Sequence, residues 1–171
     1  QDLVELKGNR YHTKKNHLNA FLKNHAWEYL PLTADCVETV LALQDDWCAW
    51  RACDDSPSLS GENNAILRAL RDWDRLPGLM GASLNVDGVM VAYTVAEPLD
   101  QETLCLHFEK ARAEFRGAYQ AVNKFFLERE GQGFLRVNRE QDLDEPGLRE
   151  AKLSYHPEAF LTKYTVDVLQ G

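Results

Sequence analysis

The chain has 171 residues, of which 44% are hydrophobic and 27% charged, and its formal net charge at pH 7 is −8. This length suits one domain that buries a core without disulfides or metals, and the composition is typical of a soluble globular protein. No signal peptide is recognisable, and no apolar run is long enough to span a bilayer. We therefore expect a cytoplasmic protein without a transmembrane segment.

The charge is unevenly distributed along the chain. Residues 1–25 hold five Lys/Arg and two Asp/Glu, a net charge of +3, whereas the remaining 146 residues hold 14 and 25, a net charge of −11. A basic segment on an acidic body indicates a local site for an anion such as a phosphate. It argues against a protein that binds DNA over its whole surface.

The chain has four cysteines, none of them in a Cys-x-x-Cys pair: Cys36, Cys48, Cys53 and Cys105. This pattern favours thiols in a cytoplasmic protein over a disulfide framework. Zinc-site spacing is also absent from the set His12, His17, His25, Cys48 and Cys53, so no metal is predicted.

The first half of the chain predicts one strand among three helices. Apolar periodicity indicates a basic amphipathic helix, a strand, a second helix and then a turn-rich break, over residues 10–25, 27–33, 36–53 and 54–61. A third helix follows, with Ile66, Leu70 and Trp73 on its buried side, and ends at Pro77-Gly78.

The second half predicts a hairpin followed by alternating strands and helices. Asp87-Gly88 lies between two apolar alternations, which makes 79–86 and 89–96 antiparallel strands, the second with Val89, Val91, Tyr93 and Val95 on one face. In a third strand, 103–109, we expect Leu104, Leu106 and Phe108 on one face and Cys105, His107 and Glu109 on the other. The remaining elements are a long helix, a strand, a helix that carries Tyr155 and a closing strand, over residues 113–130, 134–138, 146–156 and 163–169.

This order predicts an α/β (α+β) domain with a mixed, mostly antiparallel sheet and helices on both faces. The order resembles the acyl-CoA N-acyltransferase (GNAT) fold over residues 27–170. In that fold, the strand before the long helix splays from the strand after it, and the donor thioester lies in the gap. The resemblance implies that the corresponding strands here are 103–109 and 134–138.

Local motifs carry a narrower resemblance. They are Lys7-Gly-Asn-Arg-Tyr-His-Thr-Lys-Lys-Asn-His-Leu-Asn19, His107-Phe-Glu-Lys-Ala111, Asn138-Arg-Glu-x-Asp142 and Ala151-Lys-Leu-Ser-Tyr-x-Pro157. They are similar to motifs of an uncharacterised bacterial family related to the C-terminal domain of phosphatidylglycerol lysyltransferases. The resemblance implies two tandem GNAT-like halves. This chain, which begins at Gln1, would be the C-terminal half, with residues 1–26 as a basic connector and 27–171 as the domain.

The turn from the strand 103–109 into the long helix is the first candidate site. A helix N-terminus offers free N–H groups and a favourable dipole for a pyrophosphate. The GNAT resemblance implies that Arg112, Arg116 and Gly117 bind the donor phosphate, but Phe115 stands where a glycine is expected and would crowd a pyrophosphate. The alternative is a solvated helix start.

Tyr155 and two glutamates are the catalytic candidates. The GNAT resemblance implies that Tyr155 protonates the leaving group; alternatively, it anchors the helix to the sheet. Glu97 and Glu109 lie at strand ends, where either would serve as a base or would be a simple edge charge. His107 lies within a predicted strand, so we expect it to be a half-buried residue with hydrogen bonds rather than a catalytic one.

Two polar groups of residues complete the candidate site. Those expected on the acceptor side are Asn138, Glu140, Asp142 and Lys152. Those expected to contact a tRNA acceptor end or an anionic lipid headgroup are Arg10, Lys14, Lys15 and His17. For the second group, the alternative is a solvated helix face or a surface that packs against the N-terminal GNAT-like half.

These features predict an acyl- or aminoacyltransferase domain that acts on an amine or hydroxyl acceptor. The co-substrate would be acyl-CoA or aminoacyl-tRNA, and no tightly bound cofactor is expected. The alternative is a non-catalytic GNAT-like half that supports its N-terminal partner half or binds an anionic ligand.

Overall fold

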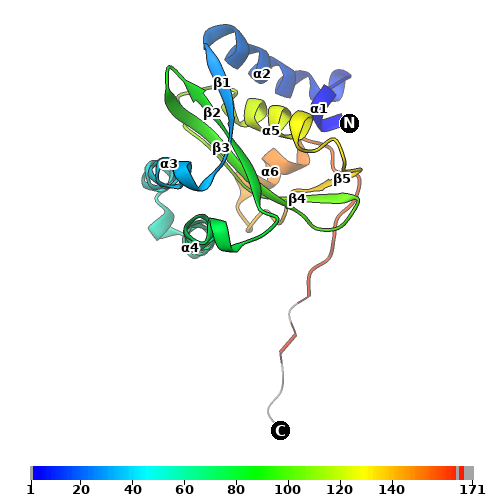
Figure 1. Cartoon of the computed structure of the whole chain (residues 1–171). Helices are drawn as coiled ribbons and strands as arrows, with labels where there is room; N and C mark the ends of the chain where they lie inside the picture. The colour runs from blue at the N-terminus through cyan, green and yellow to red at the C-terminus, as the bar shows by residue number, and fades with distance from the viewer. Residues whose placement is uncertain (1, 165, 168–171) are drawn as a thin grey trace.

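The computed structural model describes residues 2–164, 166 and 167, and shows a central sheet with helices on both faces (Figure 1). The α-helices are α1 (Asp2–Glu5), α2 (His12–Asn24), α3 (Val37–Arg51), α4 (Pro57–Arg71), α5 (Ala118–Arg129) and α6 (Pro146–Leu153). The strands are β1 (Trp27–Pro31), β2 (Met80–Val86), β3 (Val89–Pro98), β4 (Thr103–Ala111) and β5 (Arg136–Asn138). The predicted mixed α/β class is confirmed.

The five strands form one sheet in the order β1-β2-β3-β4-β5. Neighbours from β1 to β4 pair antiparallel, whereas β4 and β5 pair in parallel from Thr103↔Arg136 to Cys105↔Asn138. Beyond that pairing β4 continues to Ala111 with β3 as its only strand neighbour among the described residues, while the chain leaving β5 turns away. We call this region, between residues 106–111 and 139–145, the wedge.

Helices cover the two faces of the sheet separately. On one face α5 packs on β2, β3 and β4 and is itself covered by α1 and α2; on the other face lie α3 and α4 (Figure 1). Phe21 of α2 and Val122 of α5 belong to the first core, and Val40 of α3 and Ile66 of α4 belong to the second. The basic N-terminal helix is therefore built into the core of the domain.

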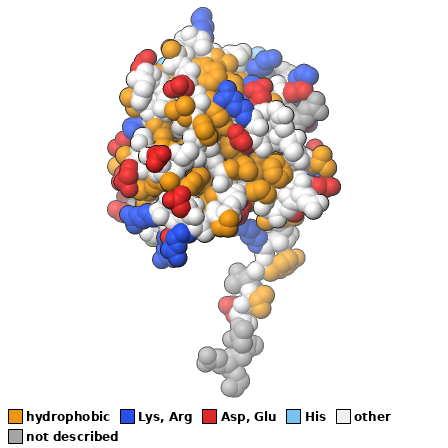
Figure 2. Space-filling model, viewed as in Figure 1, with side chains coloured by type: hydrophobic (Ala, Val, Ile, Leu, Met, Phe, Trp, Pro, Cys, Tyr) orange, Lys and Arg blue, Asp and Glu red, His pale blue; other side chains and the backbone are white. Residues whose placement is uncertain are grey.

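The surface view in Figure 2 shows hydrophobic side chains over the middle of one face, with charged side chains mostly toward its rim. Within the described residues, no helix combines the length and the apolar character that crossing a membrane requires.

An extra residue in β4 overturns part of the predicted side-chain pattern. Val95 pairs with Phe108 but Ala96 pairs with Leu106, so His107 is a bulge. A one-residue shift moves the following side chains to the opposite face. Phe108 thus packs with the α3–α4 core, apart from Leu106, and Glu109 faces α5. The expected common face is wrong for Glu109, whereas Cys105 and His107 do lie together.

A second bulge lies in the hairpin. Leu84 pairs with Ala92 but Asn85 pairs with Met90, so Val91 is the extra residue. Val91 packs in the α5-side core, whereas Tyr93 and Val95 pack toward α3 and α4, so these three residues do not share the predicted face.

Several predicted boundaries also shift, for local reasons. The helix α4 begins inside the expected turn 54–61, because the Ser56 hydroxyl caps it by accepting from the Leu59 N–H. The helix α5 begins at Ala118 rather than at 113, because Gly117 has a left-handed φ of 93°. The shorter α6 ends before Tyr155, and β5 is limited to three residues.

The expected closing strand over 163–169 is not formed by its described residues, which are 163, 164, 166 and 167; the others lie outside the described part of the chain.

The prediction that the cysteines are thiols is wrong for two of the four. Cys48 and Cys53 form a disulfide, while Cys36 and Cys105 are free. Ala52 adopts a left-handed φ of 52° and reverses the chain at the end of α3. This turn brings the two Cα atoms to 5.0 Å, within disulfide reach. The spacing alone did not reveal the turn.

Gly117 lets α2 pack directly on the N-terminus of α5. A Cβ at this position would lie 2.0 Å from the carbonyl oxygen of His17, in addition to the strain of its left-handed φ. Gly78 has a similar φ of 97° but nothing within 4 Å of such a Cβ, which makes it a matched control.

We predict that Gly117→Ala lowers the free energy of unfolding far more than Gly78→Ala, as measured by urea denaturation. The control should lose about 1–2 kcal/mol from its left-handed backbone alone. Gly117→Ala must also displace α2 from α5. Equal losses in the two variants would contradict the proposed role of the close contact.

Candidate functional site

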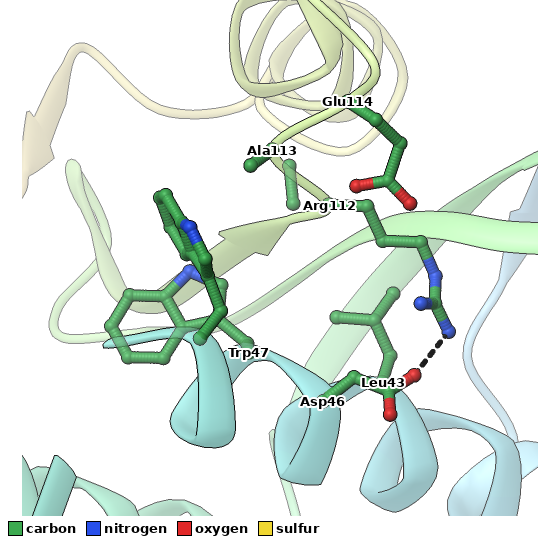
Figure 3. Close-up of a pocket in the computed structure, with 8 residues that line it drawn as sticks. Leu43, Asp46, Trp47, Arg112, Ala113 and Glu114 are labelled. Atoms are coloured by element: carbon green, nitrogen blue, oxygen red, sulfur yellow. Dashed lines mark ion pairs between the residues drawn. The ribbon is translucent and has the colours of Figure 1, made fainter. Parts of the chain in front are cut away.

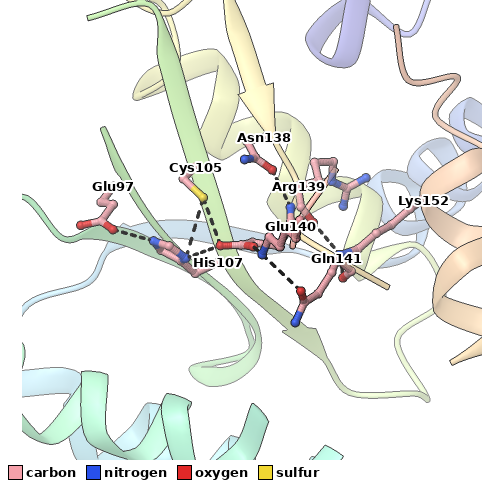
Figure 4. Close-up of polar contacts among 9 residues, drawn as sticks. Glu97, Cys105, His107, Asn138, Arg139, Glu140, Gln141 and Lys152 are labelled. Atoms are coloured by element: carbon pink, nitrogen blue, oxygen red, sulfur yellow. Dashed lines mark hydrogen bonds and ion pairs between the residues drawn. The ribbon is translucent and has the colours of Figure 1, made fainter. Parts of the chain in front are cut away.

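Polar side chains converge on the wedge and form two clusters. Figure 4 shows the one around His107, together with Arg139 and Lys152 of the other. The Tyr155 cluster consists of Lys14, Glu109, Asn123, Arg139, Lys152 and Tyr155. The His107 cluster consists of Glu97, Cys105, His107 and Glu140. Strand β4 contributes to both clusters, because the bulge at His107 turns Glu109 toward α5.

Tyr155 is buried between two cations. The Lys14 ammonium and the Arg139 guanidinium each lie 4.3 Å from the centre of its ring. The Tyr11 hydroxyl donates a hydrogen bond to the Tyr155 carbonyl at 3.3 Å, which fixes the backbone after α6. Burial raises the pKa of Tyr155 to about 12, although the Arg139 charge acts in the opposite direction. The phenol is therefore protonated at neutral pH.

Glu109 and Arg139 form an ion pair across the wedge. Arg139 donates from Nη2 to Glu109 Oε1 at 3.2 Å, and the Asn123 amide donates to Oε2 at 2.9 Å. Both carboxylate oxygens are thus engaged, in a side chain that is only 9% exposed. Arg139 Nε and Nη1 are buried without a hydrogen-bond partner among the described residues. These two nitrogens therefore have N–H groups that could donate to a ligand.

Two lysines add positive charge beside this ion pair. Burial, followed by the Arg139 charge, lowers the pKa of Lys14, which makes no ion pair within the described residues. Lys152 donates to the carbonyls of Arg139, at 2.5 Å, and of Gln141. Burial, again followed by Arg139, lowers the pKa of Lys152 to about 8. The cluster as a whole suits an anionic ligand.

The His107 cluster is a chain of short polar contacts. Glu97 Oε1 lies 2.9 Å from His107 Nε2, and Glu140 Oε1 lies 3.2 Å from Nδ1. Cys105 Sγ donates to Glu140 Oε1 at 3.4 Å and lies 3.8 Å from His107 Nδ1. Burial, and then the Glu140 carboxylate, raise the pKa of the Cys105 thiol to about 12.

Glu140 is held in place from several sides. Its backbone has a left-handed φ of 59°, and its N–H donates to Asn138 Oδ1 at 2.9 Å. Lys163 donates to its second oxygen, Oε2, at 3.0 Å. Burial raises the pKa of Glu140, but hydrogen bonds from Lys163 and Cys105 outweigh burial and lower it overall.

The three residues expected to bind donor phosphate have other neighbours, and none forms a hydrogen bond or ion pair with these clusters within the described residues. Arg112 pairs with Asp46 at 2.7 Å beside a shallow hollow lined by Trp47 and Trp50 (Figure 3). Arg116 is exposed near His17, and Gly117 is covered by α2. The ring of Phe115 packs in the α2–α5 core, and its centre lies 5.1 Å from the centre of the His25 ring.

Some of the remaining predicted residues belong to the clusters, and others have contacts elsewhere. Of the basic set, only Lys14 reaches Tyr155: Arg10 pairs with Asp2, Lys15 is exposed, and His17 has its pKa lowered by burial and by the Arg116 charge. On the acceptor side, Asp142 pairs with Arg149 at the start of α6.

Four members of the clusters were not among the predicted site residues: Cys105, His107, Asn123 and Arg139. Arg139 lies inside the motif Asn138-Arg-Glu-x-Asp142, which was the available signal. The half-buried, hydrogen-bonded interpretation of His107 is the one that the structure shows.

Comparison with known proteins links the chain to a family. The family model for the C-terminal domain of phosphatidylglycerol lysyltransferase matches residues 1–167. A conserved protein of unknown function from Bacteroides thetaiotaomicron is 38% identical with a TM-score of 0.86, covering 92% of this chain and 53% of that chain. The C-terminal domain of a protein described as a lysylphosphatidylglycerol synthetase from Agrobacterium fabrum is 16% identical with a TM-score of 0.60, covering 91% and 53%.

The fold itself extends to acetyltransferases. A ribosomal-protein-alanine N-acetyltransferase from Brucella melitensis is 12% identical with a TM-score of 0.57, covering 84% of this chain and 100% of that chain. This likeness shows the GNAT fold, as the element order predicted. The chain spans about half the length of the first two structures and 54% of the curated relative that it matches. Because the family model covers nearly the whole sequence, the chain belongs to the family of phosphatidylglycerol lysyltransferase C-terminal domains.

Proposed function

We propose that the domain transfers an acyl or aminoacyl group, and that the Tyr155 cluster binds the donor beside the bond that breaks. The supporting observation is the grouping around Tyr155: a protonated phenol, a lysine without a carboxylate partner among the described residues, and a guanidinium with unused donors. The family supports the reaction class, because its name describes transfer of a lysyl group.

In the proposed reaction, an acceptor amine or hydroxyl attacks the carbonyl carbon of the donor. A C–N or C–O bond forms, and the donor C–S bond of a thioester or C–O bond of an aminoacyl ester breaks. Tyr155 donates its proton to the leaving sulfur or oxygen, and a carboxylate takes the proton of the acceptor. Lys14 and Arg139 stabilise the negative charge that develops on the carbonyl oxygen.

The two candidate bases differ in their availability. Both oxygens of Glu109 accept hydrogen bonds, which suits a positioning role as the counter-ion of Arg139. The Glu97 side chain is 41% exposed and is the more accessible base. Glu140 would face the acceptor, and Asn138 and Asp142 shape the loop that carries it. Lys152, on α6, adds positive charge to the donor side through the Tyr155 cluster.

The donor and partners follow from the same charges. Lys14 and the neighbouring residues of α2 suit a phosphate from a tRNA acceptor end, a lipid headgroup or coenzyme A. Because α2 covers Gly117 and Asp46 pairs with Arg112, the turn before α5 offers a pyrophosphate little access. This favours an aminoacyl-tRNA donor over coenzyme A held in the usual GNAT manner. Such a donor would place the reaction in the cytoplasm. We further propose that an N-terminal GNAT-like half of the same protein completes the acceptor side.

We predict that Tyr155→Phe in the intact protein lowers kcat by about 100-fold or more, the size of a lost general acid. Its unfolding midpoint should change little, because the ring keeps its cation contacts. Tyr164→Phe is the matched control, since that side chain is 83% exposed. Unchanged transfer by Tyr155→Phe would contradict the acid role and favour a non-catalytic, supporting half.

A second prediction uses the lowered pKa of Lys152. Because Lys152 is charged below about pH 8 and neutral above it, binding of coenzyme A or of an acceptor-stem RNA should weaken severalfold as the pH rises through this value. Lys152→Met should abolish this pH dependence of binding. Lys23→Met, at an exposed position of α2, should retain it. Tryptophan fluorescence titrations at several pH values measure the binding of each ligand to each variant. A pH dependence that persists in Lys152→Met would contradict the assignment.

A further inference from the structure

We propose that Cys105, His107 and Glu140 form a zinc site where β4 and β5 part. Their ligand atoms, Sγ, Nδ1 and Oε1, all lie within 4.8 Å of one another. Two come from β4 and the third from the chain that leaves β5 (Figure 4). The proposal goes beyond the transfer reaction and does not depend on it.

The distances between the three atoms match the edges of a zinc tetrahedron. Zinc bonds of about 2.3 Å to sulfur and about 2.0 Å to nitrogen or oxygen, at tetrahedral angles, place sulfur about 3.5 Å from either lighter atom, and nitrogen about 3.3 Å from oxygen. The structure has 3.8 Å from sulfur to nitrogen, 3.4 Å from sulfur to oxygen and 3.2 Å from nitrogen to oxygen. A zinc ion fits with only small side-chain shifts.

The contacts of His107 also favour a cation. A neutral imidazole has one N–H, so it donates to only one of the two carboxylates that flank it. If Nε2 donates to Glu97, the Nδ1 lone pair faces the Glu140 oxygen at 3.2 Å, an unfavourable pairing of two acceptors. A second proton on the imidazole would let it donate to both carboxylates. With a neutral imidazole, a bound zinc ion would accept electron pairs from Nδ1 and Oε1 and remove the conflict.

Glu97 and Lys163 provide the outer contacts that a metal site requires. A carboxylate on the far nitrogen of a ligating histidine fixes its tautomer and orientation, which is the position of Glu97 at 2.9 Å. Lys163 binds Glu140 Oε2 and leaves Oε1 for the metal. Sulfur, imidazole and carboxylate ligands together suit zinc better than magnesium or calcium.

Three protein ligands leave a fourth position for water or a substrate atom. Cys105 is buried, but the side chains of His107 and Glu140 are 23% and 29% exposed, so one side of the site faces outward. Because only three residue pairs join β4 to β5, zinc would also add a bond between the strands at the point where they diverge.

The test is the zinc content of the intact protein after purification without chelators, by elemental analysis. We expect wild type to hold one zinc per chain more than Cys105→Ala, and Cys36→Ala, which removes the other free thiol, to match wild type. Cobalt substitution should give a thiolate-to-cobalt absorption band in wild type and Cys36→Ala, but not in Cys105→Ala. Circular dichroism checks that each variant is folded.

Two further measurements do not depend on removing the buried cysteine. Glu97→Gln should weaken zinc binding about 10- to 100-fold in competition with a chromophoric chelator. Added zinc should raise the unfolding temperature of wild type but not of Glu140→Gln. Wild type that binds no zinc even when titrated with it, or Cys105→Ala that retains the full zinc content, would overturn the proposal.

Discussion

The ion pair between Glu109 and Arg139 is the contact on which the rest of the site depends. It joins β4 to the chain that leaves β5 where the two strands no longer pair. Both side chains are largely buried, so removing either one would leave an uncompensated charge. The pair places the guanidinium beside Tyr155, and burial, followed by the Arg139 charge, lowers the pKa values of Lys14 and Lys152.

The N-terminal helix is coupled to this centre through packing. Lys14 of α2 and Tyr11, the residue just before α2, both contact Tyr155, and α2 lies against Gly117, the residue just before α5. A displacement of α2 would therefore expose the tyrosine and remove one of its cations. The basic segment thus has two roles in one structure: it closes the core, and it supplies charge to the proposed donor site.

The sequence predicted the elements and the sheet well, because hydrophobic periodicity and the Asp87-Gly88 turn are strong local signals. The bulge at His107 could not be predicted, since the apolar alternation continues unbroken through it, yet it decides which face Glu109 occupies. The Cys48–Cys53 disulfide depends on the left-handed turn at Ala52. Tyr155, Glu109 and Lys14 were singled out from the sequence and lie in one cluster of the structure, but Arg139, which contacts both Tyr155 and Glu109, makes these contacts only across the fold.

The central claim is that the donor's anionic group binds at Lys14 and Arg139, beside Tyr155. Its most direct test is a crystal structure of the intact protein with pyrophosphate. The claim predicts an anion in contact with the Lys14 ammonium and the Arg139 guanidinium, within reach of the Tyr155 hydroxyl. An anion bound instead at the turn that carries Arg112 and Arg116, with none beside Tyr155, would contradict it.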